Sequence, residues 1–189
     1  MADLTATKIG RDVAPYGRGV SGRLGAGLRR GIVALALLLP ACTAVQLPAG
    51  GAPLDPVAFF TGETQGTGTL RTVLGQRSTV VVRSRGTPQA GGLTLVQEIK
   101  EGSKALRIRT WTIRTGSDGF YSGSLTDAEG LVVMHVEGSR ALVAYRTPSG
   151  LSIRQQLALQ KDGRTVLNHL EAYKFGIRVA RLDEVIRKR

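Results

Sequence analysis

The sequence predicts an all-β protein, an antiparallel up-and-down barrel of about 8–10 strands over residues 55–189. Three observations support this fold class. Short segments of roughly 6–10 residues follow one another, each bounded by turn residues. Several of them alternate apolar and polar side chains with a period of two. No segment keeps a helical period for more than a turn or two.

The alternation is clearest near the C-terminus. In Leu151–Leu159, Leu151, Ile153, Leu157 and Leu159 share one face. The segment Leu93–Lys100 alternates in the same way, with Leu93, Leu95 and Ile99 on one face. In Leu106–Arg114, Arg107 and Arg109 share parity with Trp111 and Ile113, which predicts a bulge or a change of burial along the strand.

The segments expected as strands are separated by short turns, which favours a meander over parallel βαβ units. Val57–Gly62 precedes them as a short apolar lead-in of about one helical turn. The Gly-rich stretch Gly62–Gly68 lacks a following Gly-Lys-Ser/Thr and a helix, so it is interpreted as a flexible start of the first strand. The expected strands are Gly66–Leu74, Arg77–Arg85, Leu93–Lys100, Leu106–Arg114, Phe120–Leu125, Leu131–Glu137, Ala141–Thr147, Leu151–Gln160, Thr165–Tyr173 and Arg178–Arg187.

A sheet of this length avoids exposed edges by closing on itself. A barrel of about eight to ten strands leaves room for side chains or one small ligand. Residues 55–189 therefore indicate a lipocalin-like barrel or a strongly curled sheet. A transmembrane barrel is disfavoured, because basic residues recur on both parities and no aromatic girdles are present.

The N-terminal residues 1–41 have the layout of a cleaved bacterial signal peptide. Arg29 and Arg30 precede a short apolar run, which is followed by Pro40, Ala41 and Cys42. Leu39 and Ala41 fit a lipobox, so we expect cleavage before Cys42 and lipid attachment to it. The run is too short to span a bilayer. About thirty residues precede it, more than an ordinary n-region, which suggests a start further downstream, for example at Val20.

Residues 42–54 follow as a lipidated tether, because Pro and Gly are frequent up to Pro56. The net charge is +12, with basic residues spread over nearly every segment rather than in one long run. Attraction to anionic lipid explains this distribution better than nucleic-acid binding. Thr43 stands where Asp commonly signals inner-membrane retention. We therefore expect a lipid-anchored, periplasm-facing protein of the cell envelope, at the outer membrane.

Several short blocks resemble one protein family. The sequence is similar, over about residues 54–189, to a family of bacterial envelope lipoproteins classed as domain of unknown function 3833. The resemblance implies a lipocalin-like barrel on a lipid anchor, and it supplies no known activity and no catalytic residues. The blocks that carry it are Asp55–Gly62, Arg109–Ile113, Tyr121–Gly123, Leu167–His169 and Tyr173–Arg178.

Aromatic residues on the expected strands either fill the barrel or line a cavity for an apolar or amphipathic ligand. These are Trp111, Phe120, Tyr121, Tyr145 and Tyr173. An arginine then meets an acidic head group, and Arg107, Arg109 and Arg154 are the candidates. The residues predicted to contact the ligand are Trp111, Tyr121, Tyr145 and Arg109.

Catalytic or metal chemistry has little support in the sequence. His135 and His169 each have a glutamate two residues on, Glu137 and Glu171, but a zinc site needs further ligands. No Gly-x-Ser-x-Gly elbow stands in a strand–turn–helix setting. We expect no enzyme activity, no cofactor and no metal. The predicted function is the binding or sensing of a hydrophobic or amphipathic ligand; the alternative is an envelope interaction protein with a filled barrel.

Overall fold

The computed structural model describes residues 46–189, so the expected signal peptide and Cys42 lie outside the described residues. One short helix is followed by ten strands. Their bounds are α1 Pro56–Phe60, β1 Gly62–Thr72, β2 Arg77–Gln89, β3 Gly92–Glu101, β4 Arg107–Thr115, β5 Phe120–Leu125, β6 Glu129–Glu137, β7 Arg140–Arg146, β8 Ser152–Leu159, β9 Thr165–Lys174 and β10 Ile177–Lys188.

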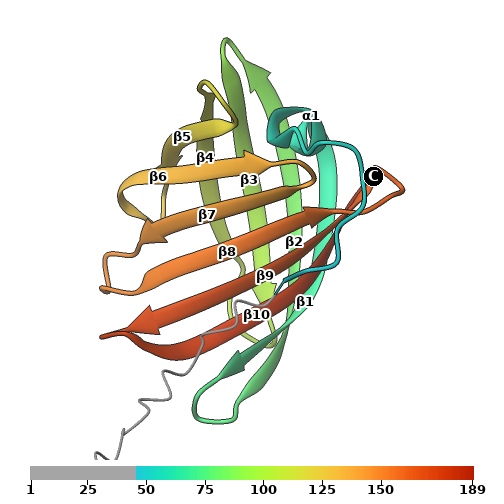
Figure 1. Cartoon of the computed structure of the whole chain (residues 1–189). Coiled ribbons are helices and arrows are strands. Elements are labelled where there is room, and N and C mark those ends of the chain that lie inside the picture. Colours follow the sequence, from blue (N-terminus) through green and yellow to red (C-terminus); the bar gives the residue numbers. More distant parts are fainter. Residues whose placement is uncertain (1–45) are drawn as a thin grey trace, which may run out of the picture. The chain divides into compact units, whose positions relative to one another are not determined.

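The strands form one closed antiparallel barrel in which each strand pairs with its neighbours in sequence (Figure 1). The first and last strands also pair, with Gly66 opposite Ile186 and Leu70 opposite Leu182. The predicted fold class is therefore confirmed. Tight turns separate the strands, and residues such as Gly75 (φ 78°) and Gly150 (φ 76°) adopt the left-handed conformation that glycine tolerates best.

The barrel interior holds the main apolar core, because alternate residues of each strand point inward. Leu93, Val166 and Ala158 are fully buried, and Trp111 and Tyr145 are more than nine-tenths buried. A smaller cluster of Val80, Val82 and Ile99 lies on β2 and β3. Apolar burial of this kind is the main favourable term in folding, at about 25 cal/mol per Å² of apolar surface.

Helix α1 packs at one end of the barrel (Figure 1). Asp55 caps it by accepting hydrogen bonds from the amides of Val57 (2.8 Å) and Ala58 (3.1 Å). Phe59 and Phe60 are both 6% exposed. A Cβ on Gly86 of β2 would lie 1.9 Å from the carbonyl oxygen of Phe60, so glycine at position 86 allows the helix to sit this close.

Residues 46–54, the part of the expected tether that the structure describes, lie against the barrel. The carbonyl oxygens of Leu47 and Pro48 accept hydrogen bonds from Arg140 (3.0 Å) and Gln160 (2.8 Å). The amide of Leu54 donates to the carbonyl of Gly138 at 2.8 Å, and the Leu54 side chain is buried. No helix among the described residues is long and apolar enough to cross a membrane.

Two local expectations are settled by the structure. Strand β1 begins at Gly62 rather than Gly66, so the Gly-rich stretch is part of the sheet and not a flexible lead. Strand β4 pairs with β3 and β5 without a register shift. The shared parity of Arg107 and Arg109 with Trp111 therefore reflects a change of burial and not a bulge.

Candidate functional site

A cavity of about 240 Å³ occupies the barrel interior. It extends from Phe60 of α1 to Glu101, Arg107, Asp127 and Thr147, which lie at the strand ends and loops of the opposite end. We call this end of the barrel, with Glu101, Arg107, Asp127 and Thr147, the mouth. Most of the lining is aliphatic or aromatic, as is usual for small-molecule sites. The apolar lining includes Leu95, Ile99, Met134, Val143, Leu157 and Ile186.

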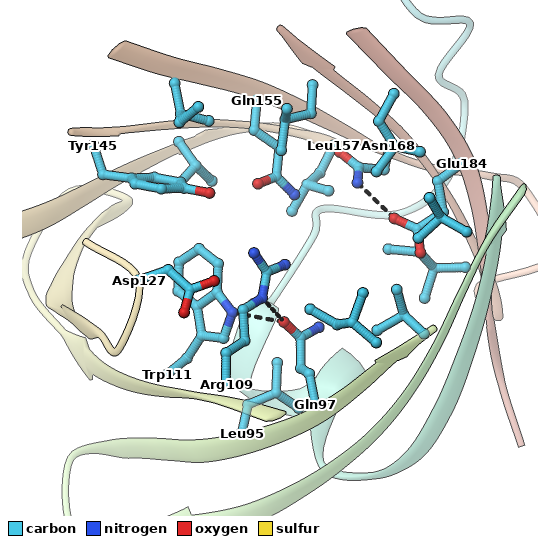
Figure 2. Close-up of a pocket in the computed structure, with 18 of the residues that line it drawn as sticks. Leu95, Gln97, Arg109, Trp111, Asp127, Tyr145, Gln155, Leu157, Asn168 and Glu184 are labelled. Carbon is cyan, nitrogen blue, oxygen red and sulfur yellow. Dashed lines mark hydrogen bonds between the residues drawn. The ribbon is translucent and has the colours of Figure 1, made fainter. Parts of the chain in front are cut away.

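Polar side chains cross this apolar interior in a layer. One side of the layer is on β2, β3 and β4, where Ser84, Gln97 and Arg109 point inward. The other side is on β8, β9 and β10, where Gln155, Asn168 and Glu184 point inward. Figure 2 shows Gln97 and Arg109 on one side, facing Gln155, Asn168 and Glu184 across open space. The cavity can therefore hold a molecule with both apolar and polar parts.

Arg109 is fixed by its neighbours on the first side of the layer. Its Nε donates to Oε1 of Gln97 at 2.8 Å, and Nε1 of Trp111 donates to the same oxygen at 2.8 Å. The Gln97 amide nitrogen donates in turn to Oγ of Ser84 at 3.2 Å. The guanidinium carbon lies 5.5 Å from the centroid of the Trp111 ring, within cation–π range.

Glu184 is the buried acid of the second side, with 7% of its surface exposed. Nδ2 of Asn168 donates to its Oε2 at 2.8 Å. Burial raises the pKa of Glu184 above its usual value, although the Asn168 hydrogen bond and the charge of Arg109 act in the opposite direction. The protonated form is thus favoured relative to an exposed glutamate.

Trp111 and Tyr145 form an aromatic pair on the cavity wall. Their ring centroids are 5.9 Å apart and the planes meet at 85°, an edge-to-face arrangement. Burial raises the pKa of the Tyr145 phenol, with Arg109 opposing the shift. The phenol therefore stays protonated at neutral pH and can donate a hydrogen bond into the cavity.

Three of the four residues predicted to contact a ligand line this cavity: Trp111, Tyr145 and Arg109. Tyr121 does not. It is half-buried on β5 beside a separate hollow of about 10 Å³. The predicted lipid site, Cys42, lies outside the described residues.

Other candidates are divided between the mouth and the outer surface. Arg107 lies at the mouth, where it forms a salt bridge with Asp127. Arg154 stacks over the Tyr173 ring at 5.4 Å outside the cavity. Phe120 is half exposed and stacks on His135 with ring centroids 4.3 Å apart. Phe120 and Tyr173 therefore do not line the cavity, and Phe120 does not fill the barrel either.

The histidines do not come together. His169 is buried, and its Nδ1 lies 2.6 Å from Oδ1 of Asp183 on β10, while His135 contacts Phe120 on β5. Within residues 46–189 no group of three potential metal ligands is close enough to hold an ion. The absence of enzyme activity stays a prediction.

Sequence reasoning missed Gln97, Gln155, Asn168 and Glu184. A usable signal was present, because each stands at the inward parity between apolar residues two positions away on either side. Gln97 lies between Leu95 and Ile99, and Glu184 lies between Leu182 and Ile186. A polar residue in the middle of an inward-facing apolar row marks the polar layer.

A closed antiparallel barrel with an internal cavity and a short helix at one end defines a lipocalin-like protein. Within that class, the chain belongs to the DUF3833 family of proteins of unknown function, whose profile matches residues 36–188. The resemblance seen in the sequence is thereby confirmed. A search of curated proteins found no match.

Solved structures show the same barrel at very low identity. An S-type phycobiliprotein lyase from Guillardia theta is 4% identical, with a TM-score of 0.55 over 70% of this chain and 90% of that chain. A protein of unknown function from the DUF3598 family of Nostoc punctiforme is 14% identical, with a TM-score of 0.53 over 72% of this chain. The match covers 50% of the Nostoc chain. At such identities the likeness concerns the fold alone.

Proposed function

We propose that this protein binds a hydrophobic or amphipathic small molecule inside its barrel. The observation that carries the proposal is the cavity of about 240 Å³, which is lined mainly by apolar side chains and crossed by a polar layer. At about 30 Å³ per water molecule, its volume corresponds to about eight waters. A filled barrel that acts only through its surface is at odds with this cavity.

The loops around the mouth support access by an apolar ligand. Leu74 of the β1–β2 loop is 83% exposed, Leu106 of the β3–β4 loop 56%, and Phe175 of the β9–β10 loop 93%. In an up-and-down barrel these three loops lie at the same end. An apolar rim of this kind lowers the cost of transferring a hydrophobic molecule from a membrane or carrier into the cavity.

The proposal is tested by substituting a larger side chain at an inward-facing position of one strand. Val143 of β7 is buried and lines the cavity, whereas its neighbour Leu142 is 56% exposed on the outer face. Native mass spectrometry of the full chain purified from cells should show a retained small molecule. Val143→Phe should reduce the occupied fraction about tenfold or more, because the added ring takes up the binding volume.

Leu142→Phe is the matched control and should retain the ligand, since it adds the same ring outside the barrel. Thermal unfolding of both variants shows whether the fold survives; overpacking costs typically about 1–3 kcal/mol. Loss of ligand in both variants, or the absence of any retained molecule in wild type, argues against binding within the barrel.

We further propose that Cys42 carries a lipid and holds the barrel at a bacterial envelope membrane, facing the periplasm. Cys42 lies five residues before Leu47, which contacts the barrel; five residues span at most about 18 Å. The barrel would then stay close to the bilayer. Metabolic labelling with a palmitate analogue should be lost in Cys42→Ala, and persistent labelling would refute the anchor.

A further inference from the structure

Arg109 is a positive charge inside the barrel whose orientation is set before any ligand arrives. Gln97 accepts from its Nε, and Ser84 accepts from Gln97, so the side chain is held through two strands. The Trp111 ring lies under the guanidinium. Nε of Arg109 is held by Gln97, and the two terminal amino groups point toward the open space beside the Tyr145 phenol (Figure 2).

Neither neighbouring acid neutralises this charge directly. Asp127 forms its salt bridge with Arg107, and Glu184 accepts its hydrogen bond from Asn168. Within the described part of the chain Arg109 forms no salt bridge. A cation in an apolar enclosure is costly unless it is paired, so the site favours a ligand that brings the negative charge.

The facing wall offers complementary polar groups. Oε1 of Gln155 and Oδ1 of Asn168 are buried and have no hydrogen-bond partner among the described residues. The Gln155 amide points toward Arg109 across the gap (Figure 2). Buried acceptors without a donor are uncommon and destabilising. A ligand hydroxyl placed between Arg109 and Gln155 would satisfy one of them.

We propose that the ligand is a single-chain amphipathic acid whose anionic head group binds the free edge of Arg109. The head group is a carboxylate or a phosphate monoester, since the planar guanidinium presents two parallel donors that match either. Where the head group carries a hydroxyl, as a phosphate monoester monoanion does, that hydroxyl donates to Gln155. The hydrocarbon chain lies against Leu157 and Ile186 toward α1. This inference rests on the proposed binding function and names its ligand class.

Cavity size limits the chain. A volume of about 240 Å³ is below the roughly 300–1,000 Å³ of ordinary ligand pockets, so a two-chain phospholipid does not fit. A medium-length single chain fits the volume better. In a cavity this small, the head group makes a large share of the contacts between ligand and protein. Arg109 should therefore have a large effect on which head group is selected.

Trp111 provides a direct signal for the test. It is the only tryptophan in the chain, and it lies on the cavity wall beside Arg109. Its fluorescence can be titrated in the purified full chain with four probes of equal chain length: decanoate, decyl phosphate, decanol and decyltrimethylammonium. Wild type should bind one or both acids about ten- to a hundredfold more tightly than decanol. The ratio between the two acids then distinguishes carboxylate from phosphate.

Arg109→Gln should reduce this preference to near unity while decanol binding changes little. Arg154→Gln is the matched control, because Arg154 lies outside the cavity over Tyr173 and should leave all four affinities unchanged. Should Arg109→Gln fail to fold, the ranking of the four probes by wild type decides alone. Equal binding of decanol and the acids, or preference for the cation, overturns the acidic ligand but leaves the binding function standing. Binding of none of the probes overturns the acid ligand, and the separate search for a retained molecule then decides the binding function.

Discussion

Glu184 can occupy the barrel interior because two residues of β1 beside it have no side chain: Gly68, which is opposite Glu184, and Gly66, which is opposite Ile186. A Cβ on Gly66 would lie 1.8 Å from Oε1 of Glu184, and a Cβ on Gly68 would lie 2.9 Å from its Cα. The carboxyl group is therefore accommodated at the expense of apolar packing. Because burial raises its pKa, the folded protein holds the Glu184 proton more tightly than the unfolded chain does.

This linkage predicts that Glu184 lowers the free energy of unfolding by an amount that depends on pH. A raised folded-state pKa means that the contribution of Glu184 to stability is fully present below the usual value of 4.5 and is lost as pH rises through the folded-state pKa. Glu184→Gln keeps an acceptor for Asn168 but cannot ionise. Its free energy of unfolding, from urea titrations between pH 4 and 8, should exceed that of wild type by an amount that grows with pH and then levels off.

Glu98→Gln is the matched control, since Glu98 lies at an outward position of β3 and is exposed. A constant difference for Glu184→Gln, or one that shrinks as pH rises, would show that the carboxyl ionises at least as readily in the folded protein as in the unfolded one.

At the residue scale, the sequence predicted the kind of site, an internal ligand cavity, better than it predicted which residues line it. Trp111, Tyr145 and Arg109 were identified because large aromatic and basic residues on strands are natural cavity residues. Tyr121 was not distinguishable from them, since only the tertiary packing places it beside a separate hollow. Glu184 was missed because its carboxyl is admitted by Gly66, which lies more than a hundred residues away in sequence.

Among the elements, α1 closes one end of the barrel although it has only five residues. So short a helix is not stable alone and depends on its cap and its packing. Nζ of Lys188, at the end of β10, donates to the carbonyl oxygens of Ala58, Phe59 and Thr61 at 2.8–2.9 Å. The helix is thus tied to the last strand as well as capped by Asp55.

Removing the cap should weaken this closure measurably. Asp55→Ala leaves the amides of Val57 and Ala58 without their acceptor, so the free energy of unfolding in urea should fall by about 1 kcal/mol. Asp55→Asn should stay close to wild type, since its amide oxygen can still accept. A fall of the same size in both variants would mean that the negative charge, rather than the hydrogen bonds, stabilises the helix.

The strands were largely predictable because Gly, Asp and Ser separate the apolar–polar segments, and turns of this composition end strands locally. The start of β1 was not. Gly62, Gly66 and Gly68 suggest flexibility when considered alone, yet they are ordered because β1 is paired on both sides, with β2 and β10. For β4 the sequence was compatible with either a bulge or a change of burial along the strand. Only the pairing register, which has no shift, excludes the bulge.

For the whole molecule, closure depends on the pairing of β1 with β10. A chain ending after Gly176 lacks β10 and with it the buried Ile186 and the Lys188 contacts to α1. Both β1 and β9 then have an exposed edge. We predict that this truncated chain loses cooperative thermal unfolding and elutes as aggregates in size-exclusion chromatography. A chain lacking only Arg189, which follows β10, should melt cooperatively; a cooperative, monomeric truncation would refute the dependence on closure.

The same pairing orders folding in time. The chain emerges from the ribosome N-terminus first, but β1 cannot gain its second neighbour until Lys188 has been synthesised. The other nine pairings join strands that are neighbours in sequence, so only the closing contact spans the entire domain, and such long-range closure is slow. The proposed periplasmic location is compatible with this delay, because a translocation channel accepts an unfolded chain. Under that proposal, the barrel closes only after the last strand has passed through the membrane.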